Sequence, residues 1–419
     1  MKFLLLSAAL LLAILPAPSR ADLLVKPHDL VLVSAEAPPD SRGLSVDIAA
    51  YFLMCQPVEG IQFLNACQIY DGIEAFMKRI DTDIAPWHPT VALISHGVGD
   101  GVNNAQSRGT TYYIPTYLGK TIDELKQLSV RTIVVGSPGC VDSLNFHNDH
   151  VDAKAWNDNL AAVRDAERQI AAKGGAAFAD LFTPMLDAIP KAKALHGAQY
   201  SFGGADAMRP SANSQLIMAY AFLKSLGCDG AIGTISVDLA ANKAEGTPGQ
   251  AILSCQNGTV EIESSRYPFC FLGDPSSPDS TAGIFPAFPF NDDLNRYLLV
   301  VKGLAAQRAK VTWGNQSREF AAADLARGVN LAAAFAAHTP FDNQFRKVQD
   351  AIWVRQLQQY YWIGDFFHYK SDYQQMAPDA AASVDKISTA IVEDNRAAGN
   401  ALAALVVPVR HTLKIESLP

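Results

Sequence analysis

After its first residues, the 419-residue sequence lacks any apolar run long enough to cross a bilayer, which excludes a polytopic membrane protein. It also lacks a long basic block, and its formal net charge is -8. Both features argue against a partner made of nucleic acid or an anionic membrane surface. No Cys-x-x-Cys pair is present, so nothing indicates a zinc ribbon. We also find no internal repeat.

The first 21 residues have the pattern of a secretory signal peptide. Lys2 supplies a positive start, Phe3 to Leu15 form the apolar run, and Ser19-Arg20-Ala21 resembles a cleavage site. The apolar run is too short to span a hydrocarbon core of roughly 30 Å. We therefore expect a mature protein that begins near Asp22, has no membrane segment or lipid anchor, and is periplasmic or secreted.

Cysteine is scarce, and its count suits an exported protein. The six cysteines are at positions 55, 67, 140, 228, 255 and 270. An even number in an oxidising compartment permits disulfides, but spacing does not fix their connectivity. Cys255 with Cys270 is the first pair to test.

The length favours one larger and one smaller domain, and the pattern before Gly227 is typical of a doubly wound α/β fold. Five short apolar runs alternate with amphipathic stretches. The expected strands are 30–33, 61–64, 91–95, 131–135 and 176–179, and the expected helices are 44–54, 71–81, 119–128, 154–173 and 212–226. Right-handed crossovers would make the sheet parallel, with any site at the carboxyl ends of its strands. We expect this domain to cover 22–235.

The second module, 236–419, is expected to be mixed α and β. Its predicted strands are 259–267, 298–301 and 409–415, its predicted helices are 340–369 and 381–405, and a Pro- and Ser-rich loop covers 273–289. The aromatic residues between Trp353 and Tyr369 recur near helical spacing. This spacing favours a place in the core over a sugar-binding platform.

Four blocks in the first domain carry a family resemblance. The blocks are Ser34-Ala35-Glu36-Ala37 after the first strand, Phe63 to Gln68, His88 to Gly101, and Gly204 to Asn213. In order and spacing they resemble the catalytic blocks of the SGNH (GDSL-type) hydrolases, which are esterases and lipases. The resemblance implies a flavodoxin-like parallel sheet, hydrolysis of an acyl or carbohydrate ester, and no cofactor.

Each block departs from the family pattern at its signature residue. In this register Ala37 stands at the nucleophile position, Cys67 at the oxyanion-hole glycine and Gly99 at the asparagine, while Asp206 is retained and Arg209 replaces the histidine. Ala37 has no hydroxyl, and a guanidinium that stays protonated cannot act as a base. Loss of either group costs on the order of 10⁶-fold in turnover in a comparable Ser-His-Asp enzyme. A backbone amide at Cys67 could still serve as an oxyanion donor.

Several residues could replace the lost groups. Ser34 or Ser41 could be a displaced nucleophile, and Glu36 with Asp40 could form a carboxylate pair suited to glycoside hydrolysis. The possible metal ligands are His96, His147, Asp149 and His150. For each of these, a bland role in a solvated loop is the simpler interpretation.

Arg209 has two interpretations of its own. It could form a salt bridge with Asp206, or it could hold a carboxylate or sulfate of an acidic sugar.

Two hypotheses of different classes follow. The first is a catalytically silent protein that binds a small-molecule or polysaccharide ester. The second is an active esterase or deacetylase that uses displaced residues. Metal-assisted hydrolysis is a third, minor alternative.

Overall fold

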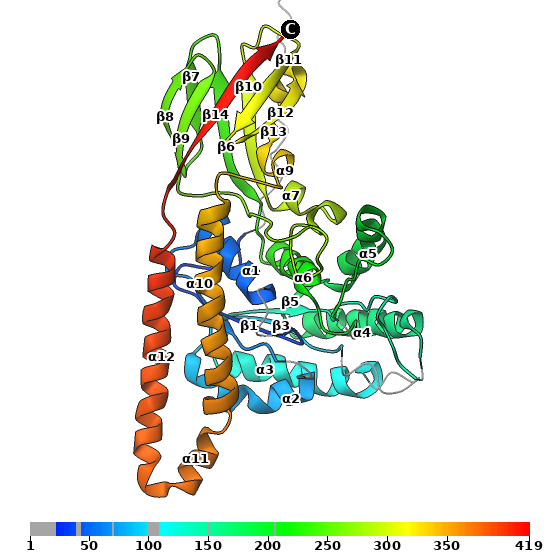
Figure 1. Ribbon diagram of the computed structural model, residues 1–419. Coiled ribbons are helices and arrows are strands. Elements are labelled where there is room, and N and C mark those ends of the chain that lie inside the picture. Colours follow the sequence, from blue (N-terminus) through cyan, green and yellow to red (C-terminus); the bar gives the residue numbers. More distant parts are fainter. Residues whose placement is uncertain (1–21, 39–42, 69–70, 99–108, 150, 205–206) are drawn as a thin grey trace, which may run out of the picture.

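The computed structural model describes residues 22–38, 43–68, 71–98, 109–149, 151–204 and 207–419. The predicted signal peptide therefore lies outside the described residues. An α/β domain, a β-sandwich and a long helical hairpin make up the chain (Figure 1). Within the described ranges, no helix is both long and apolar enough to cross a membrane.

The α/β domain is built on a five-stranded sheet of order β2-β1-β3-β4-β5. All four pairings in it are parallel. The strands are β1 (Leu30–Ala35), β2 (Gln62–Asn65), β3 (Val91–Ser95), β4 (Thr132–Gly136) and β5 (Ala177–Ala179). This is the flavodoxin-like order 2-1-3-4-5. The predicted fold class and each of the five predicted strands are confirmed.

Helices cover both faces of this sheet because successive strand residues point to opposite sides. On β1, Val31, Val33 and Ala35 join the core beneath α1 (Leu44–Ala50) and α6 (Ala212–Ser225). Leu32 points the other way, into a second core. That core lies under α2 (Ile73–Arg79), α3 (Gly119–Gln127) and part of α4 (Ala153–Lys173). The sheet is therefore doubly wound.

One helix of this domain is absent from the sequence prediction. Helix α5 (Phe182–His196) contains Pro190. Its Pro184 and Pro190 disguise the helical pattern, since proline is disfavoured inside helices. Pro184 lies in the first turn, where the missing N–H has no intrahelical partner to lose.

The second module contains more strands than the sequence predicts. One sheet has the order β13-β10-β6-β7, and the other has the order β12-β11-β14-β9-β8. The strands are β6 (Ala231–Asp238), β7 (Lys243–Gly246), β8 (Gln250–Gln256), β9 (Thr259–Ser264), β10 (Arg296–Lys302), β11 (Arg308–Trp313), β12 (Gln316–Ala321), β13 (Val329–Asn330) and β14 (Val409–Leu418). The module also contains the short helices α7 (Phe290–Asp293), α8 (Ala322–Arg327) and α9 (Leu331–Ala334). The expected domain border at 235/236 falls inside β6, which pairs with β10 and β7 of this module.

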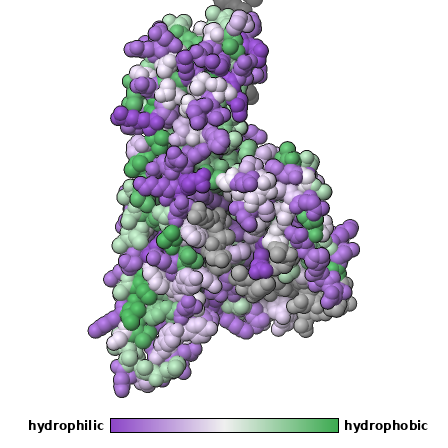
Figure 2. Space-filling model, viewed as in Figure 1, coloured by the Kyte–Doolittle hydropathy of each residue, from purple (hydrophilic) through white to green (hydrophobic). Residues whose placement is uncertain are grey.

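A helical hairpin joins the two parts of the chain. Helix α10 (Asp342–Tyr361) descends along the α/β domain, α11 (Lys370–Met376) forms the turn, and α12 (Ala381–Ala404) returns beside α10 (Figure 1). Figure 2 shows apolar residues on the outer face of this hairpin. Val354, Tyr361 and Ile387 are among its exposed side chains.

The hairpin also closes the free edge of the parallel sheet. Strand β2 is an edge strand, and the Gln359 amide of α10 pairs with it in place of another strand. Asn65 N donates to Gln359 Oε1 at 2.9 Å, and Gln359 Nε2 donates to Phe63 O at 2.9 Å. These bonds satisfy an edge that would otherwise be open to pairing with another chain.

All six cysteines are free thiols. Cys255 and Cys270, the pair singled out from the sequence, are therefore not bonded to each other. Cys270 is buried, with its Sγ 3.4 Å from Thr339 Oγ1, whereas Cys255 is half-buried on β8.

Candidate functional site

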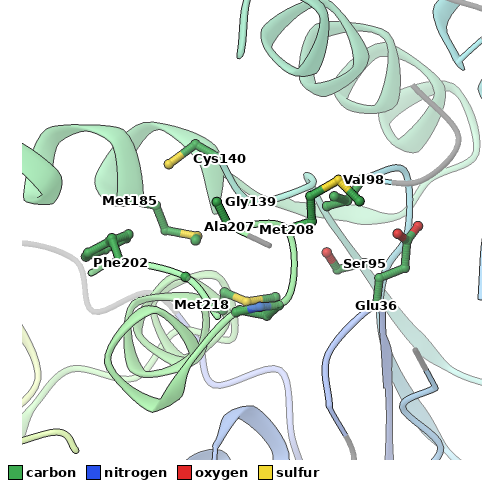
Figure 3. A pocket seen from close by; sticks show the side chains of 12 residues that line it. Glu36, Ser95, Val98, Gly139, Cys140, Met185, Phe202, Ala207, Met208 and Met218 are labelled. Atoms are coloured by element: carbon green, nitrogen blue, oxygen red, sulfur yellow. The ribbon is translucent and has the colours of Figure 1, made fainter. Parts of the chain in front are cut away.

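A pocket lies at the carboxyl ends of the parallel strands, where the fold places ligand sites. It is formed by the segments that follow β1, β3 and β4, together with α5, α6 and the segment that precedes α6 (Figure 3). Its lining residues are Glu36, Ser95, Val98, Gly139, Cys140, Met185, Phe202, Gly203, Ala207, Met208, Pro210 and Met218. Three of the four blocks identified in the sequence therefore meet here. We refer to this pocket as the carboxyl-edge pocket; its volume is about 20 Å³.

Glu36 supplies the carboxylate of this pocket. Its side chain leaves the loop directly after β1, and Oε1 accepts a hydrogen bond from Gly97 N at 2.6 Å. Gly97 has a φ of 131°, which favours glycine, and a Cβ there would lie 3.2 Å from Val163 Cγ1. The hydrogen bond between the Glu36 carboxylate and the Gly97 amide thus joins the loops that follow β1 and β3.

Ser95 is the hydroxyl nearest to that carboxylate in the lining, but it is already engaged. Its Oγ donates to the backbone oxygen of Ser137 at 2.8 Å. Across the pocket lie the sulfur atoms of Cys140, Met185 and Met218 (Figure 3). Burial raises the pKa of the Cys140 thiol, so it stays protonated at neutral pH. This wall is soft and apolar and contains no activated nucleophile.

Gln215 of α6 fixes the two segments that border the pocket. Its Oε1 accepts from Leu44 N at 2.8 Å, and its Nε2 donates to Pro210 O at 2.8 Å. The first amide of α1 is thereby satisfied without a conventional capping residue, since Gly43 offers no side chain. A Cβ at Gly43 would collide with the Gln215 side chain.

The predicted nucleophile and oxyanion positions are both buried. Ala37 is 1% exposed, packs in the core with α1 and α6, and does not line the pocket. Cys67 is 2% exposed, and its backbone amide donates to Asn65 Oδ1 at 3.1 Å. The amide expected to serve as an oxyanion donor is therefore already used. In this geometry Glu36, one residue before Ala37, is the residue of the first block that faces the pocket.

Most of the remaining predicted positions are not described by the structure. Gly99, Asp206, Asp40, Ser41 and His150 lie outside the described residues. Arg209 is exposed and does not line the pocket, although its neighbour Met208 does. The proposed Asp206–Arg209 salt bridge stays a prediction.

A serine and a histidine do approach each other, but away from the pocket. Ser34 Oγ on β1 lies 3.3 Å from His96 Nε2, directly after β3. His96 Nδ1 lies 2.5 Å from the backbone oxygen of Asp71, which can only accept a hydrogen bond, so Nδ1 carries the proton. Nε2 can then accept from the Ser34 hydroxyl, which also lies 3.3 Å from a second acceptor, the backbone oxygen of Ala66. Ser34 is fully buried, however, so a substrate has no access to its hydroxyl.

An ion-pair cluster surrounds this serine and histidine. Arg79 Nε donates to Asp71 Oδ2 at 2.9 Å, and Arg79 Nη2 donates to Ala66 O at 2.9 Å. The His96 ring stacks on Phe76 with centroids 4.7 Å apart. Burial lowers the pKa of His96 to about 4. The imidazole is therefore neutral at pH 7. We call this group, with Asp83, the sealed polar cluster.

The remaining histidines and aromatic residues do not extend the site. His147 and Asp149 are exposed and do not line the pocket, and no group of three potential metal ligands occurs within the described ranges. The aromatic segment 353–369 is divided. Phe367 is buried against Trp87, whereas Tyr361 and Tyr369 are exposed.

Sequence reasoning overlooked most of the pocket wall. Cys140 lies between two blocks and belongs to neither, and Met185 and Met218 belong to helices, so none of the three is part of a motif. The one available signal was the position of Gly139-Cys140 just after a predicted strand, which places them at the carboxyl edge.

Comparison with known proteins gives structural matches only. No family model matches the chain, and no curated protein matches it. A solved gut microbial diltiazem-metabolizing enzyme superposes with a TM-score of 0.71 at 20% identity, covering 94% of this chain and 98% of that one. This similarity extends over both the α/β domain and the C-terminal module, and it shows a shared fold.

Smaller proteins match about half of the chain. One is a catalytic mutant of an acetylxylan esterase from Geobacillus stearothermophilus, with a TM-score of 0.39 and 16% identity over 49% of this chain and 96% of that one. Another is a putative GDSL-like lipase from Parabacteroides merdae, with a TM-score of 0.40 and 16% identity over 49% and 99%. The strand order and the full-length superposition identify the fold: the chain has a flavodoxin-like α/β domain followed by a β-rich module, an architecture that it shares with the diltiazem-metabolizing enzyme.

Proposed function

We propose that the protein is an exported, non-hydrolytic binder of an acyl or carbohydrate ester, held at the carboxyl-edge pocket. The observation that carries the proposal is that the serine–histidine pair and the pocket lie in different places. The described lining of the pocket contains Glu36 and Ser95 but no imidazole. The serine and histidine that do meet, Ser34 and His96, are buried in the sealed polar cluster.

The pocket composition supports binding of a ligand with a small apolar group once the methionine side chains move aside, because a volume of about 20 Å³ holds roughly one water molecule. Met185, Met208 and Met218 give flexible, polarisable walls that can adapt to such a group. The Glu36 carboxylate can accept a hydrogen bond from a ligand hydroxyl, because its two oxygens offer about four lone-pair sites and the Gly97 amide occupies one of them.

The direct test combines turnover and binding measurements. We expect the purified protein to hydrolyse an aryl acetate and a sugar acetate no faster than the buffer does. We also expect calorimetry to detect saturable binding of one of these esters, and Met218→Lys to abolish that binding. Ester hydrolysis by the unmodified protein that a serine-directed reagent abolishes would contradict the proposal.

Restoring catalysis would test the register of the first block. Glu36→Ser with Arg209→His places a hydroxyl at the residue that faces the pocket, whereas Ala37→Ser with Arg209→His places it at a core position. If activity returns, we expect it only in the Glu36 variant. Activity only in the Ala37 variant would restore the register inferred from the sequence.

One observation favours a second candidate function, an esterase that uses displaced residues. In the Ser34–His96 contact, the histidine has the tautomer required of a base, with Nε2 able to accept the hydroxyl proton at 3.3 Å. This function requires measurable hydrolysis by the unmodified protein that disappears in Ser34→Ala.

A further inference from the structure

The opposite edge of the parallel sheet carries a larger hollow than the carboxyl-edge pocket. It lies at the amino ends of the strands, between them and α12, and its volume is about 380 Å³. Pockets that hold small molecules are typically roughly 300 to 1,000 Å³. We call it the amino-edge groove. Its lining residues are His28, Asp29, Leu30, Gly60, Gln62, Trp87, His88, Thr90, Arg396 and Asn400.

Two histidines occupy equivalent and unusual positions along this groove. His28 precedes Val31 by three residues and His88 precedes Val91 by three, and Val31 pairs with Val91 in neighbouring parallel strands. Both histidines have left-handed backbones, with φ of 65° and 55°. Such a conformation is uncommon for residues other than glycine and often marks functional segments.

The hydrogen-bond donors that line the groove are largely uncommitted. Within the described ranges, the Arg396 guanidinium and the His88 imidazole make no side-chain hydrogen bond or ion pair. His28 has only a distant neighbour, Glu59, with 4.0 Å between Nε2 and Oε1. Asn400 uses its Oδ1 to accept from Gln62 Nε2 at 3.2 Å, which leaves its amide N–H groups available.

The carboxylate that lines the groove is, in contrast, fully occupied. Asp29 accepts from Lys26 N at 2.6 Å, from Thr90 Oγ1 at 2.7 Å and from Arg131 Nη2 at 2.6 Å. The ion pair with Arg131 offsets its negative charge, so it adds little repulsion toward a bound anion. Available donors next to a neutralised carboxylate favour an anionic ligand over a cation.

From this donor set we propose that the amino-edge groove binds an oxyanion group, held by the Arg396 guanidinium from α12 and by the imidazole N–H groups of His28 and His88. The guanidinium matches the oxygens of a carboxylate, sulfate or phosphate in a bidentate arrangement. The site is independent of the proposed function, because it shares no residue with the carboxyl-edge pocket.

Isothermal titration of the full chain at low salt tests the proposal. The probes are inorganic phosphate, inorganic sulfate and galacturonate, with galactose as the neutral control. We expect at least one anion to bind and galactose not to bind. Selectivity for galacturonate identifies a carboxylate-bearing sugar as the ligand, and selectivity for phosphate or sulfate identifies a tetrahedral oxyanion.

Matched variants assign the binding to the groove. Arg396→Gln removes one exposed guanidinium, and Lys386→Gln removes one charge from the same helix outside the groove. We expect Arg396→Gln, and separately the double variant His28→Gln with His88→Gln, to weaken binding about tenfold or more, and Lys386→Gln less than about twofold. Glu36→Gln should leave it unchanged. The proposal is wrong if none of the anions binds, or if Arg396→Gln and Lys386→Gln weaken binding equally.

Discussion

The carboxyl-edge pocket and the sealed polar cluster lie within a few residues of each other on β1, yet they divide the requirements of catalysis between them. The pocket lies at the open carboxyl edge of the sheet, and its described wall carries Glu36, thiol and thioether groups but no imidazole. The cluster has a serine hydroxyl 3.3 Å from a neutral histidine, but it is buried. Proximity in sequence thus does not bring these groups together.

Strand geometry explains the division. Alternate residues of β1 face opposite sides of the sheet, so Ser34 points toward α2 while Ala35 packs beneath α1 and α6. A hydroxyl inside the strand cannot turn to the open edge without breaking the pairing with β2 and β3. A serine two residues further along, at the position of Glu36, would face the pocket instead of the sealed polar cluster.

Breaking the ion pairs of the sealed polar cluster should have the largest effect. Arg79→Leu leaves the buried carboxylates of Asp71 and Asp83 without their cation, which typically costs about 3–5 kcal/mol of unfolding free energy. Urea denaturation measures the change. The neighbouring exposed Lys78→Leu should cost no more than about 0.5 kcal/mol. Equal losses in the two variants would show that the cluster is not buried as described.

The second effect is a loss of stability in acid. His96 has a folded pKa of about 4, below its usual value of 6.5, so the unfolded chain binds more protons between these values. The unfolding free energy should therefore fall as pH decreases from 6.5 to 4, by up to about 3 kcal/mol from this residue. His411 of the sandwich, with a pKa lowered to about 3 by burial, adds a fall of the same sign.

Urea denaturation at several pH values separates the two histidines. His96→Gln should reduce the slope of unfolding free energy against pH by up to about 1.4 kcal/mol per pH unit between pH 6 and 5. Glu36→Gln, in the accessible pocket, is the control. An unchanged slope in His96→Gln would mean that the ring is not neutral in the folded chain.

The hydrophobic pattern of the sequence was sufficient to predict the parallel sheet, because each of its strands is buried on both faces and appears as a short, continuous apolar run. Val91–Ser95 matches its predicted bounds, and the other strands differ by one or two residues at an end. The sandwich was harder to predict because its strands are half exposed and include polar residues, as in Gln316–Ala321. Alternation of this kind is easily mistaken for a loop.

The candidate site was less predictable than the fold. The order of the four blocks in the sequence located the edge of the sheet that carries the pocket. A shift of one residue, however, decides whether Ala37 or Glu36 faces the pocket. The backbone after β1 determines that orientation. The Ser34–His96 contact was also unpredictable, since 62 residues separate its members and only the β1–β3 pairing brings them together.

A smaller effect distinguishes structural from catalytic roles for the sealed serine. Ser34→Ala removes a hydroxyl that contacts His96 and Ala66 O, and we expect a loss of about 1 kcal/mol in unfolding free energy. Ester turnover should stay at the buffer rate in both proteins. Ester hydrolysis that is present in the parent and absent in Ser34→Ala would show that the sealed polar cluster, and not the carboxyl-edge pocket, is the reactive region.

The smallest effect is expected in the pocket itself. In Glu36→Gln, the amide oxygen can still accept from Gly97 N, so the loops after β1 and β3 stay joined and the unfolding free energy should change by less than about 0.5 kcal/mol. Ester binding should weaken if the carboxylate accepts a hydrogen bond from the ligand, because a charged acceptor is stronger than a neutral one. Calorimetry on both proteins measures this difference. A large loss of stability with unchanged ester binding would instead assign Glu36 to the framework of the fold, leaving the methionine wall as the part of the pocket that contacts the ligand.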